Sequence, residues 1–226
     1  MLRNFLKTAT RNILKYKAYS VINFIGLTSG LALALLIITY VRSELSYDQF
    51  HEKKDRLYRM SYSVPNGLQL ASTPPPIAPV LTEYFPDVEA TARVYGRNVS
   101  ITRPNETEAY EESGVFFADA TLFDMFTFDF VKGNPALALK EKFTVIINEE
   151  MAKKYFGDAN PIGESLVLAG RQSFKVTAVV KDFPENSHFR FNMLVPYDNM
   201  FDLETEQTAQ ILRKNLEINF IISHSY

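Results

Sequence analysis

The sequence predicts an α+β protein that consists of one N-terminal transmembrane helix followed by a mixed α/β domain. Two observations carry this prediction. Residues 21–41 form an apolar run without a single charge. The rest of the chain mixes strand-like and helix-like stretches without the regular alternation that is typical of a parallel sheet. With 46% hydrophobic and 22% charged residues, the composition is that of a folded globular protein.

The apolar run is long enough to cross a bilayer. As an α-helix, its 21 residues would extend over about 31 Å, which matches the hydrocarbon thickness of a membrane. A signal peptide has a shorter apolar region that ends at a small-x-small cleavage site, whereas this run ends in ITYVRSELSYD. We therefore expect an uncleaved span over residues 20–42, in preference to a signal peptide or a buried core helix.

The flanking charges predict the orientation of this span. Residues 1–41 carry five cations and no acid, and the flank after the run mixes both signs. This bias places the N-terminus in the cytoplasm and the residues after about 42 outside. The whole chain has a net charge of -2, so the outer part carries -7. An acidic surplus of this size argues against nucleic acid as a partner.

Residues 1–19 are predicted to form an amphipathic helix at the cytoplasmic membrane interface. Apolar residues fall on one helical stripe and cations at a spacing of four on another. A basic amphipathic helix of this kind binds anionic membrane lipid. The alternative is an ordinary basic flank of the span. The cations assigned to this interface are Arg3, Lys7, Arg11, Lys15 and Lys17.

Small residues mark one face of the predicted span. Gly26, Gly30 and Ala34 recur every four residues, and small side chains at this spacing allow a second helix to approach closely. We therefore assign these three residues to helix packing. The alternative is chance, because glycine and alanine are common in membrane spans. A simple anchor would not need such a face.

Residues 43–226 are predicted to form the mixed α/β domain. A helical stalk is expected first, at residues 43–55. Asn148 is expected to cap a helix that Gly157 ends, and Gly170 is expected to turn a β-hairpin. The other elements expected are strands at 57–64, 93–102, 108–118, 188–197 and 218–226, and helices at 77–85 and 199–217.

No stretch of the sequence predicts catalysis, a cofactor or a metal. The three histidines are not at ligand spacing, cysteine is absent, and no glycine-rich phosphate loop is present. The pairs at 111–112 and 149–150 are adjacent glutamates, which point apart on a strand or a helix. In the phenylalanine-rich stretch 116–130, an aromatic-lined pocket is an alternative to core packing, which we favour.

Three stretches together resemble MacB/FtsX-type ABC transporter permeases. The first stretch resembles the N-terminal segment of such permeases: RNFLKTATRNILKYKAYSVINFIGLTSGLALALLIITYVRSELSYDQFHEKKDRLYRM. The other two stretches resemble parts of the MacB-like periplasmic core domain of these permeases: INEEMAKKYFGDANPIGESLVL and FKVTAVVKDFPENSHFRFNMLVPY. The likeness extends over nearly the whole chain.

The resemblance implies a permease of the bacterial inner membrane with four membrane helices. It implies an extracytoplasmic domain of two lobes, one porter-like and one inserted. Such permeases form homodimers or heterodimers and are not catalytic themselves. They work with a cytoplasmic ABC ATPase, which is expected to be a separate chain here, because none precedes residue 1. ATP-driven movement of the outer domain, called mechanotransmission, then exports or extracts envelope substrates.

The end of the sequence adds two expectations and leaves one alternative. The chain stops at Tyr226, before any second membrane helix. Measured against the family, the domain 43–226 is therefore expected to be C-terminally incomplete, with an unpaired strand edge near the C-terminus. The single span also leaves an alternative open: a membrane-anchored extracytoplasmic module that binds a ligand or partner, as a sensor or an assembly factor.

Overall fold

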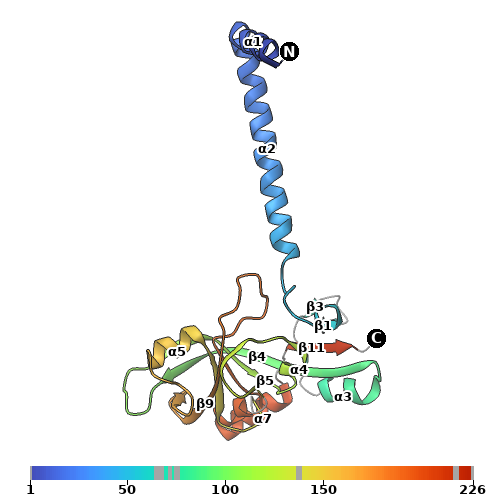
Figure 1. The fold of residues 1–226 in the computed structure, drawn as a ribbon. Helices are drawn as coiled ribbons and strands as arrows, with labels where there is room; N and C mark the ends of the chain where they lie inside the picture. Colours follow the sequence, from blue (N-terminus) through green and yellow to red (C-terminus); the bar gives the residue numbers. More distant parts are fainter. Residues whose placement is uncertain are drawn as a thin grey trace. The chain divides into compact units, whose positions relative to one another are not determined.

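The computed structural model divides the chain into two compact units, Met1–Tyr47 and Asp48–Tyr226. The first unit is helical, and the second is built around a large β-sheet with short helices (Figure 1). This mixed α/β architecture behind one long apolar helix confirms the predicted fold class. The structure describes residues 2–63, 69–70, 73, 77–135, 139–215 and 219–224.

The first unit consists of helices α1 (Leu2–Lys15) and α2 (Lys17–Leu45). Tyr16 separates them, because its φ of -113° and ψ of 55° lie outside the α-helical region. Among the described residues, α2 is the one helix long and apolar enough to cross a membrane.

Three hydroxyl side chains of α2 form hydrogen bonds within the helix. The hydroxyls of Thr28, Ser29 and Thr39 donate to backbone carbonyls one turn earlier, at 2.7, 2.8 and 2.9 Å. Such internal bonds remove the cost of placing a hydroxyl in hydrocarbon. These three hydroxyls are therefore compatible with an apolar environment around the helix.

The predicted helical stalk at 43–55 is wrong beyond Leu45, where α2 ends. The backbone of Asp48 has a φ of 54°, which a right-handed helix does not allow. Turns follow, and then the short 3₁₀ helix η1 (Lys54–Arg56). The local charge pattern favours a helix here, but contacts of Asp48 with the rest of the outer unit hold it in the left-handed conformation.

The outer unit contains a nine-stranded sheet in the part of the chain that the structure describes. A separate two-stranded sheet pairs β2 (Tyr62–Ser63) with β3 (Gln69–Leu70). The strands of the large sheet are β1 (Leu57–Arg59), β4 (Val88–Thr102), β5 (Tyr110–Ala118), β6 (Phe130–Gly133), β7 (Thr144–Asn148), β8 (Ser165–Leu168), β9 (Gln172–Val180), β10 (Met193–Pro196) and β11 (Asn219–His224).

Six of these strands close into a ring. The path β4-β5-β10-β7-β9 is continuous, and β8 pairs with both β9 and β4. The pairs β5·β10 and β7·β9 are parallel, whereas the other pairs of the ring are antiparallel. The sheet is therefore mixed, as expected for the α+β class.

Strand β11 corrects the expectation of an unpaired edge near the C-terminus. It pairs antiparallel with β4 on one side and with β1 on the other. Within the described residues, the path of the sheet ends at β1 and at β6 instead. The expectation failed because the strand that follows the first unit in the chain, β1, covers the side of β11 that would otherwise be open.

Short helices complete the outer unit. Asn148 caps α5 as predicted, because its Oδ1 accepts the Met151 N–H at 2.9 Å, and Gly157 ends this helix with a φ of 59°. The single helix predicted at 199–217 is broken into two at residues 203–205. The helices are α3 (Ile77–Tyr84), α4 (Leu122–Met125), α5 (Glu149–Phe156), α6 (Asn199–Asp202) and α7 (Glu206–Asn215).

Two buried apolar clusters lie on the two faces of the sheet. Along β7, Val145 and Ile147 belong to one cluster and Ile146 belongs to the other. Successive strand residues point to opposite faces, so β7 is covered by protein on both sides. This strand therefore lies between two layers of packed apolar side chains.

Candidate functional site

The segment that follows the apolar helix is bonded to the rest of the outer unit. We call residues 48–56 the junction segment. Its first residue, Asp48, donates its backbone N–H to the carbonyl of Asn186 at 3.0 Å. The Asp48 carboxylate accepts the His188 backbone N–H at 3.0 Å, the Ser187 hydroxyl at 3.3 Å and the His188 Nδ1–H at 2.8 Å. One carboxylate thus fixes the junction segment to the loop before β10.

His51 is the buried centre of the junction segment, with 2% of its surface exposed. Its Nδ1 accepts the Thr127 N–H at 3.2 Å, so the neutral ring carries its proton on Nε2. Nε2 has no hydrogen-bond partner and lies 4.0 Å from Oδ1 of Asp48. Burial lowers the pKa of His51, and the Asp48 carboxylate opposes this shift only in part. Burial and the bond accepted by Nδ1 therefore both favour the neutral ring.

Further bonds spread the attachment over two other parts of the unit. Glu52 donates its N–H to Oγ1 of Thr127 at 3.0 Å, and Lys53 Nζ donates to the carbonyl of Asp124 at 2.7 Å. Arg56 pairs with Glu89 of β4 at 3.2 Å. Because separate elements contribute, a displacement of the junction segment has to move them or break these bonds.

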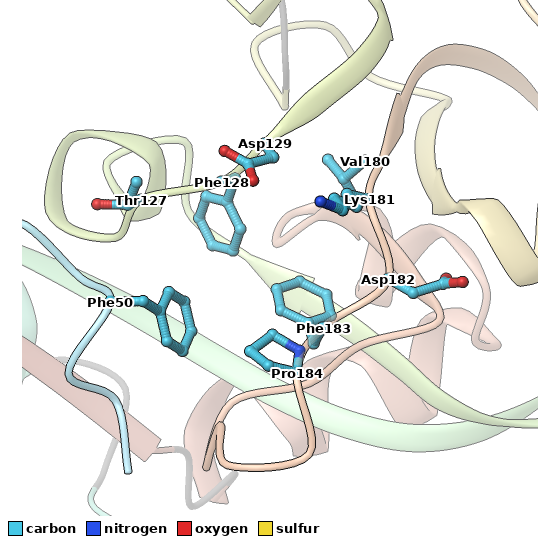
Figure 2. A pocket seen from close by; sticks show the side chains of 9 residues that line it. All are labelled: Phe50, Thr127, Phe128, Asp129, Val180, Lys181, Asp182, Phe183 and Pro184. Carbon is cyan, nitrogen blue, oxygen red and sulfur yellow. The ribbon is translucent and has the colours of Figure 1, made fainter. Parts of the chain in front are cut away.

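Three of the recesses in the outer unit are lined in part by residues of the junction segment, and Figure 2 shows the first, which has a volume of about 430 Å³. The rings of Phe50, Phe128, Phe183 and Pro184 come from three chain segments and surround a common hollow (Figure 2). Asp182 also lines it, but its Oδ1 accepts the backbone N–H at the start of α5. The second recess has a volume of about 450 Å³ and includes Asp48, His51 and His188 in its lining.

The phenylalanine-rich stretch combines the two roles weighed for it. Leu122 and Met125 are fully buried, which agrees with core packing. Phe126 and Phe128 pack against the same cluster, but Phe128 also lines the first recess and Phe126 also lines the second. The alternative of an aromatic-lined pocket therefore holds for part of the stretch.

The site residues predicted from the sequence belong to the first unit, whereas the bonds just described belong to the outer unit. Arg3, Lys7, Arg11 and Lys15 are exposed on α1 at a spacing that places them on one side, and Lys17 begins α2. On α2, a Cβ added at Gly26 or Gly30 would meet no atom within 4 Å, and Ala34 is exposed. Their roles in lipid binding and helix packing stay predictions.

A family comparison gives this architecture its context. Residues 20–222 match the family model of the MacB-like periplasmic core domain. The chain belongs to this family. The resemblance to MacB-type permeases inferred from the sequence is thereby confirmed, and the chain is a component of the MacB-like class of ABC transporter permeases. No curated protein matches the sequence significantly.

Solved structures share the fold at low sequence identity. A domain of a protein assigned as a permease in Porphyromonas gingivalis has a TM-score of 0.62 at 22% identity, over 77% of each chain. The periplasmic region of MacB from Actinobacillus actinomycetemcomitans gives 0.51 at 15%, over 68% of this chain and 65% of that one. The extracellular domain of the noncanonical ABC-type transporter YknZ from Gram-positive bacteria gives 0.51 at 18%, over 75% and 82%.

The family places the chain in a broad functional class. MacB-like permease subunits are generally not catalytic, and the family implies a cytoplasmic ATPase as partner. An apolar helix before a domain of the periplasmic type is the arrangement of an inner-membrane protein with an extracytoplasmic domain.

Proposed function

We propose that this chain is a permease subunit that passes movement from the membrane to an extracytoplasmic domain, driven by ATP hydrolysis on a separate cytoplasmic subunit. In this proposal, residues 1–19 lie at the cytoplasmic interface, 20–42 cross the membrane, and 43–226 form the outer domain. The movement would serve export or extraction of envelope substrates. The observation that carries the proposal is the network of bonds that holds the junction segment.

The bonds begin almost directly after the apolar helix. Only Ser46 and Tyr47 lie between the end of α2 and Asp48, so little chain is available to absorb a displacement. From Asp48 to Arg56, the backbone and side chains are bonded to the loop before β10, to the connection after α4 and to β4. A shift or rotation of α2 would therefore reach the sheet rather than be lost in a flexible linker.

Residues of the first unit would serve assembly. The face formed by Gly26, Gly30 and Ala34 suits close packing with another membrane helix, either of the same transporter or of a second permease in a homodimer or heterodimer. The cations Arg3, Lys7, Arg11, Lys15 and Lys17 would bind anionic lipid on the cytoplasmic side. The double variant Gly26→Leu/Gly30→Leu is expected to weaken assembly while the outer domain stays folded, and unchanged assembly would contradict this role.

Site-specific cross-linking tests the proposed partner. A photoreactive amino acid at Lys7, in the native membrane, is expected to capture an ATP-binding protein, whereas the same group at the exposed Lys132 of β6 is not. Capture of an ATPase at neither position, together with a stable and fully folded chain, would favour the alternative of a single-pass binding or sensor module.

Limited proteolysis tests the coupling itself. Trypsin cleavage after Lys53 and Lys54 reports on the junction segment, because the bonds of this segment restrict access to it. In the assembled transporter, trapping the ATPase with ATP and vanadate is expected to change this cleavage rate. The variant Asp48→Ala should remove most of the nucleotide effect, and the exposed Asp158→Ala should retain it. A cleavage rate that never responds to nucleotide would contradict transmission through this segment.

A further inference from the structure

Two histidine rings take part in the attachment of the junction segment, and they do so in opposite ways. His51 is buried, and its Nδ1 accepts the Thr127 N–H at 3.2 Å. His188 is exposed, and its Nδ1–H donates to the Asp48 carboxylate at 2.8 Å. One ring is an acceptor and the other is a donor, so the addition of a proton affects the two attachments differently.

A protonated His51 ring cannot keep its bond to Thr127. An imidazolium carries a hydrogen on both nitrogens and has no acceptor left, so its Nδ1–H would face the Thr127 N–H. A buried donor without a partner is costly. The Glu52 N–H donates to Oγ1 of Thr127 at 3.0 Å and joins the same two chain segments. Loss of the first bond is therefore expected to weaken the second.

The described surroundings of His51 provide no substitute for this bond. The ring centroids of Phe50 and Phe126 lie 4.0 and 4.8 Å from that of His51, and neither ring offers a carbonyl or carboxylate oxygen. Oδ1 of Asp48 is 4.0 Å from Nε2, which is beyond hydrogen-bond distance, and it already accepts two hydrogen bonds. A protonated ring would therefore have to leave its position.

The charges around His51 are of both signs. Asp48 favours a proton on the ring, whereas the cations of the second recess disfavour it. Strands β4 and β5 contribute only apolar residues to this recess. Burial is the largest influence and lowers the pKa of His51. The titratable and charged residues that line the second recess with His51 are Asp48, Lys54, Tyr58, Arg59 and His188, and those that line a third recess with Thr127 are Glu52, Lys53 and Asp124.

The His188 attachment responds to acid in the other direction. A proton added at Nε2 leaves the Nδ1–H in place and gives the ring a charge, which strengthens a hydrogen bond to a carboxylate. Two backbone bonds support the same attachment: the His188 N–H donates to Asp48, and the Asp48 N–H donates to the carbonyl of Asn186, both at 3.0 Å. Mild acid, in which carboxylates ordinarily stay ionised, therefore preserves it.

We infer that mild acid releases His51 and Glu52 from Thr127 while Asp48 stays bonded to the loop before β10. The release follows from the donors and acceptors of these bonds and does not depend on the proposed function. Its consequence for coupling does rest on that function. In acid, a displacement of α2 would still reach the loop before β10, but its transmission to the connection after α4 would be weakened.

Hydrogen exchange of the full chain in nanodiscs tests the release without an ATPase. Mass spectrometry with electron-transfer fragmentation resolves single amides, and each rate is compared with that of an unstructured amide at the same pH. Between about pH 7.5 and about pH 5.5, protection of the Thr127 and Glu52 amides is expected to fall about tenfold, because the released ring takes up a proton near the ordinary histidine pKa of about 6.5. Protection of the Asp48 and His188 amides should change by less than about twofold.

Two matched variants assign the effect to one histidine. His51→Asn keeps an oxygen that can accept the Thr127 N–H but cannot be protonated, so protection should no longer fall in acid. His188→Asn should retain the fall at Thr127 and Glu52. A fall that His51→Asn retains would overturn the inference.

The four amides of the unmodified chain decide the question even without a variant. Unchanged protection of Thr127 and Glu52 in acid, or an equal fall at all four amides, would overturn the selective release. The measurement involves no nucleotide, whereas the proposed function is tested by nucleotide-dependent cleavage. Failure of one is therefore distinguishable from failure of the other.

Discussion

Helix α2 and strand β7 are both rich in apolar side chains, yet their surroundings are opposite. All five residues of β7 are buried within the outer unit, whereas α2 has no buried residue. Leu33 of α2 is 60% exposed, and Ile147 of β7 is 0% exposed. The same hydrophobic driving force acts on both segments, so the exposed apolar side chains of α2 require an apolar environment to cover them.

The two segments differ in length, and the length of an apolar segment determines which environment can cover it. A strand of five residues can be covered on both faces by neighbouring strands and helices. A helix of 29 residues that is apolar on all sides needs a hydrocarbon layer around it, and a bilayer supplies one of suitable thickness. We therefore expect that substitutions in β7 affect the stability of the outer unit, whereas substitutions in α2 affect membrane insertion.

The largest difference is expected for truncation to alanine. Ile147→Ala should lower the free energy of unfolding of the outer unit by about 3 kcal/mol, because it leaves a cavity in a packed core. Leu33→Ala should leave that free energy unchanged. Denaturant titration of the full chain in detergent measures both. Equal destabilisation by the two variants would show that α2 packs into a protein core.

A charge in the middle of α2 tests whether this helix is surrounded by lipid. Leu33→Arg should make membrane insertion less favourable by about 3 kcal/mol, while Leu33→Phe should not. The fraction inserted is read from a reporter enzyme fused after the outer unit. Normal insertion of the arginine variant would argue against contact between this side chain and lipid.

The junction segment is expected to show a smaller effect. Asp48→Ala removes a carboxylate that accepts three hydrogen bonds, and it should destabilise the outer unit by about 2 kcal/mol. Asp158→Ala, at an exposed residue, should have almost no effect. Similar unfolding curves for the two variants would mean that the Asp48 contacts contribute little.

The smallest predicted effect depends on pH. The pKa of His51 lies below its usual value of 6.5, because burial disfavours the charged ring. The unfolded chain therefore takes up this proton first, and the contribution of His51 to stability is complete above pH 6.5 and is lost as the pH falls below it.

The variant His51→Asn isolates this contribution. Its amide oxygen can still accept the Thr127 N–H, but it cannot be protonated. The loss of stability below pH 6.5 should therefore be smaller in the variant than in the unmodified chain, as measured by denaturant titration across this range. An identical pH profile for both chains would show that other groups cause the loss.

The sequence allows the locally encoded parts of the fold to be predicted. The long apolar run predicts α2, the helix 77–85 corresponds to α3, and Asn148 caps α5 as expected. In these cases the signals lie within a few residues of the element they specify. Hydrophobic periodicity and capping residues are signals of this kind.

The junction segment could not be predicted for the opposite reason. Asp48 and His188 are 140 residues apart in the sequence, and His51 and Thr127 are 76 apart. The error at residues 43–55 has the same origin, because long-range bonds stabilise the positive φ of Asp48 against a local helical preference. The pairing of β11 with β1 is likewise a long-range contact that no local pattern encodes.

The central claim is that α2 crosses the membrane and carries the outer unit to the outside. The chain contains no cysteine, so a single cysteine can be introduced at Lys7 or at Lys132 and labelled in intact cells with a membrane-impermeant maleimide. Our account predicts labelling at position 132 in intact cells and at position 7 only after permeabilisation. Labelling of position 7, but not of position 132, in intact cells would contradict it.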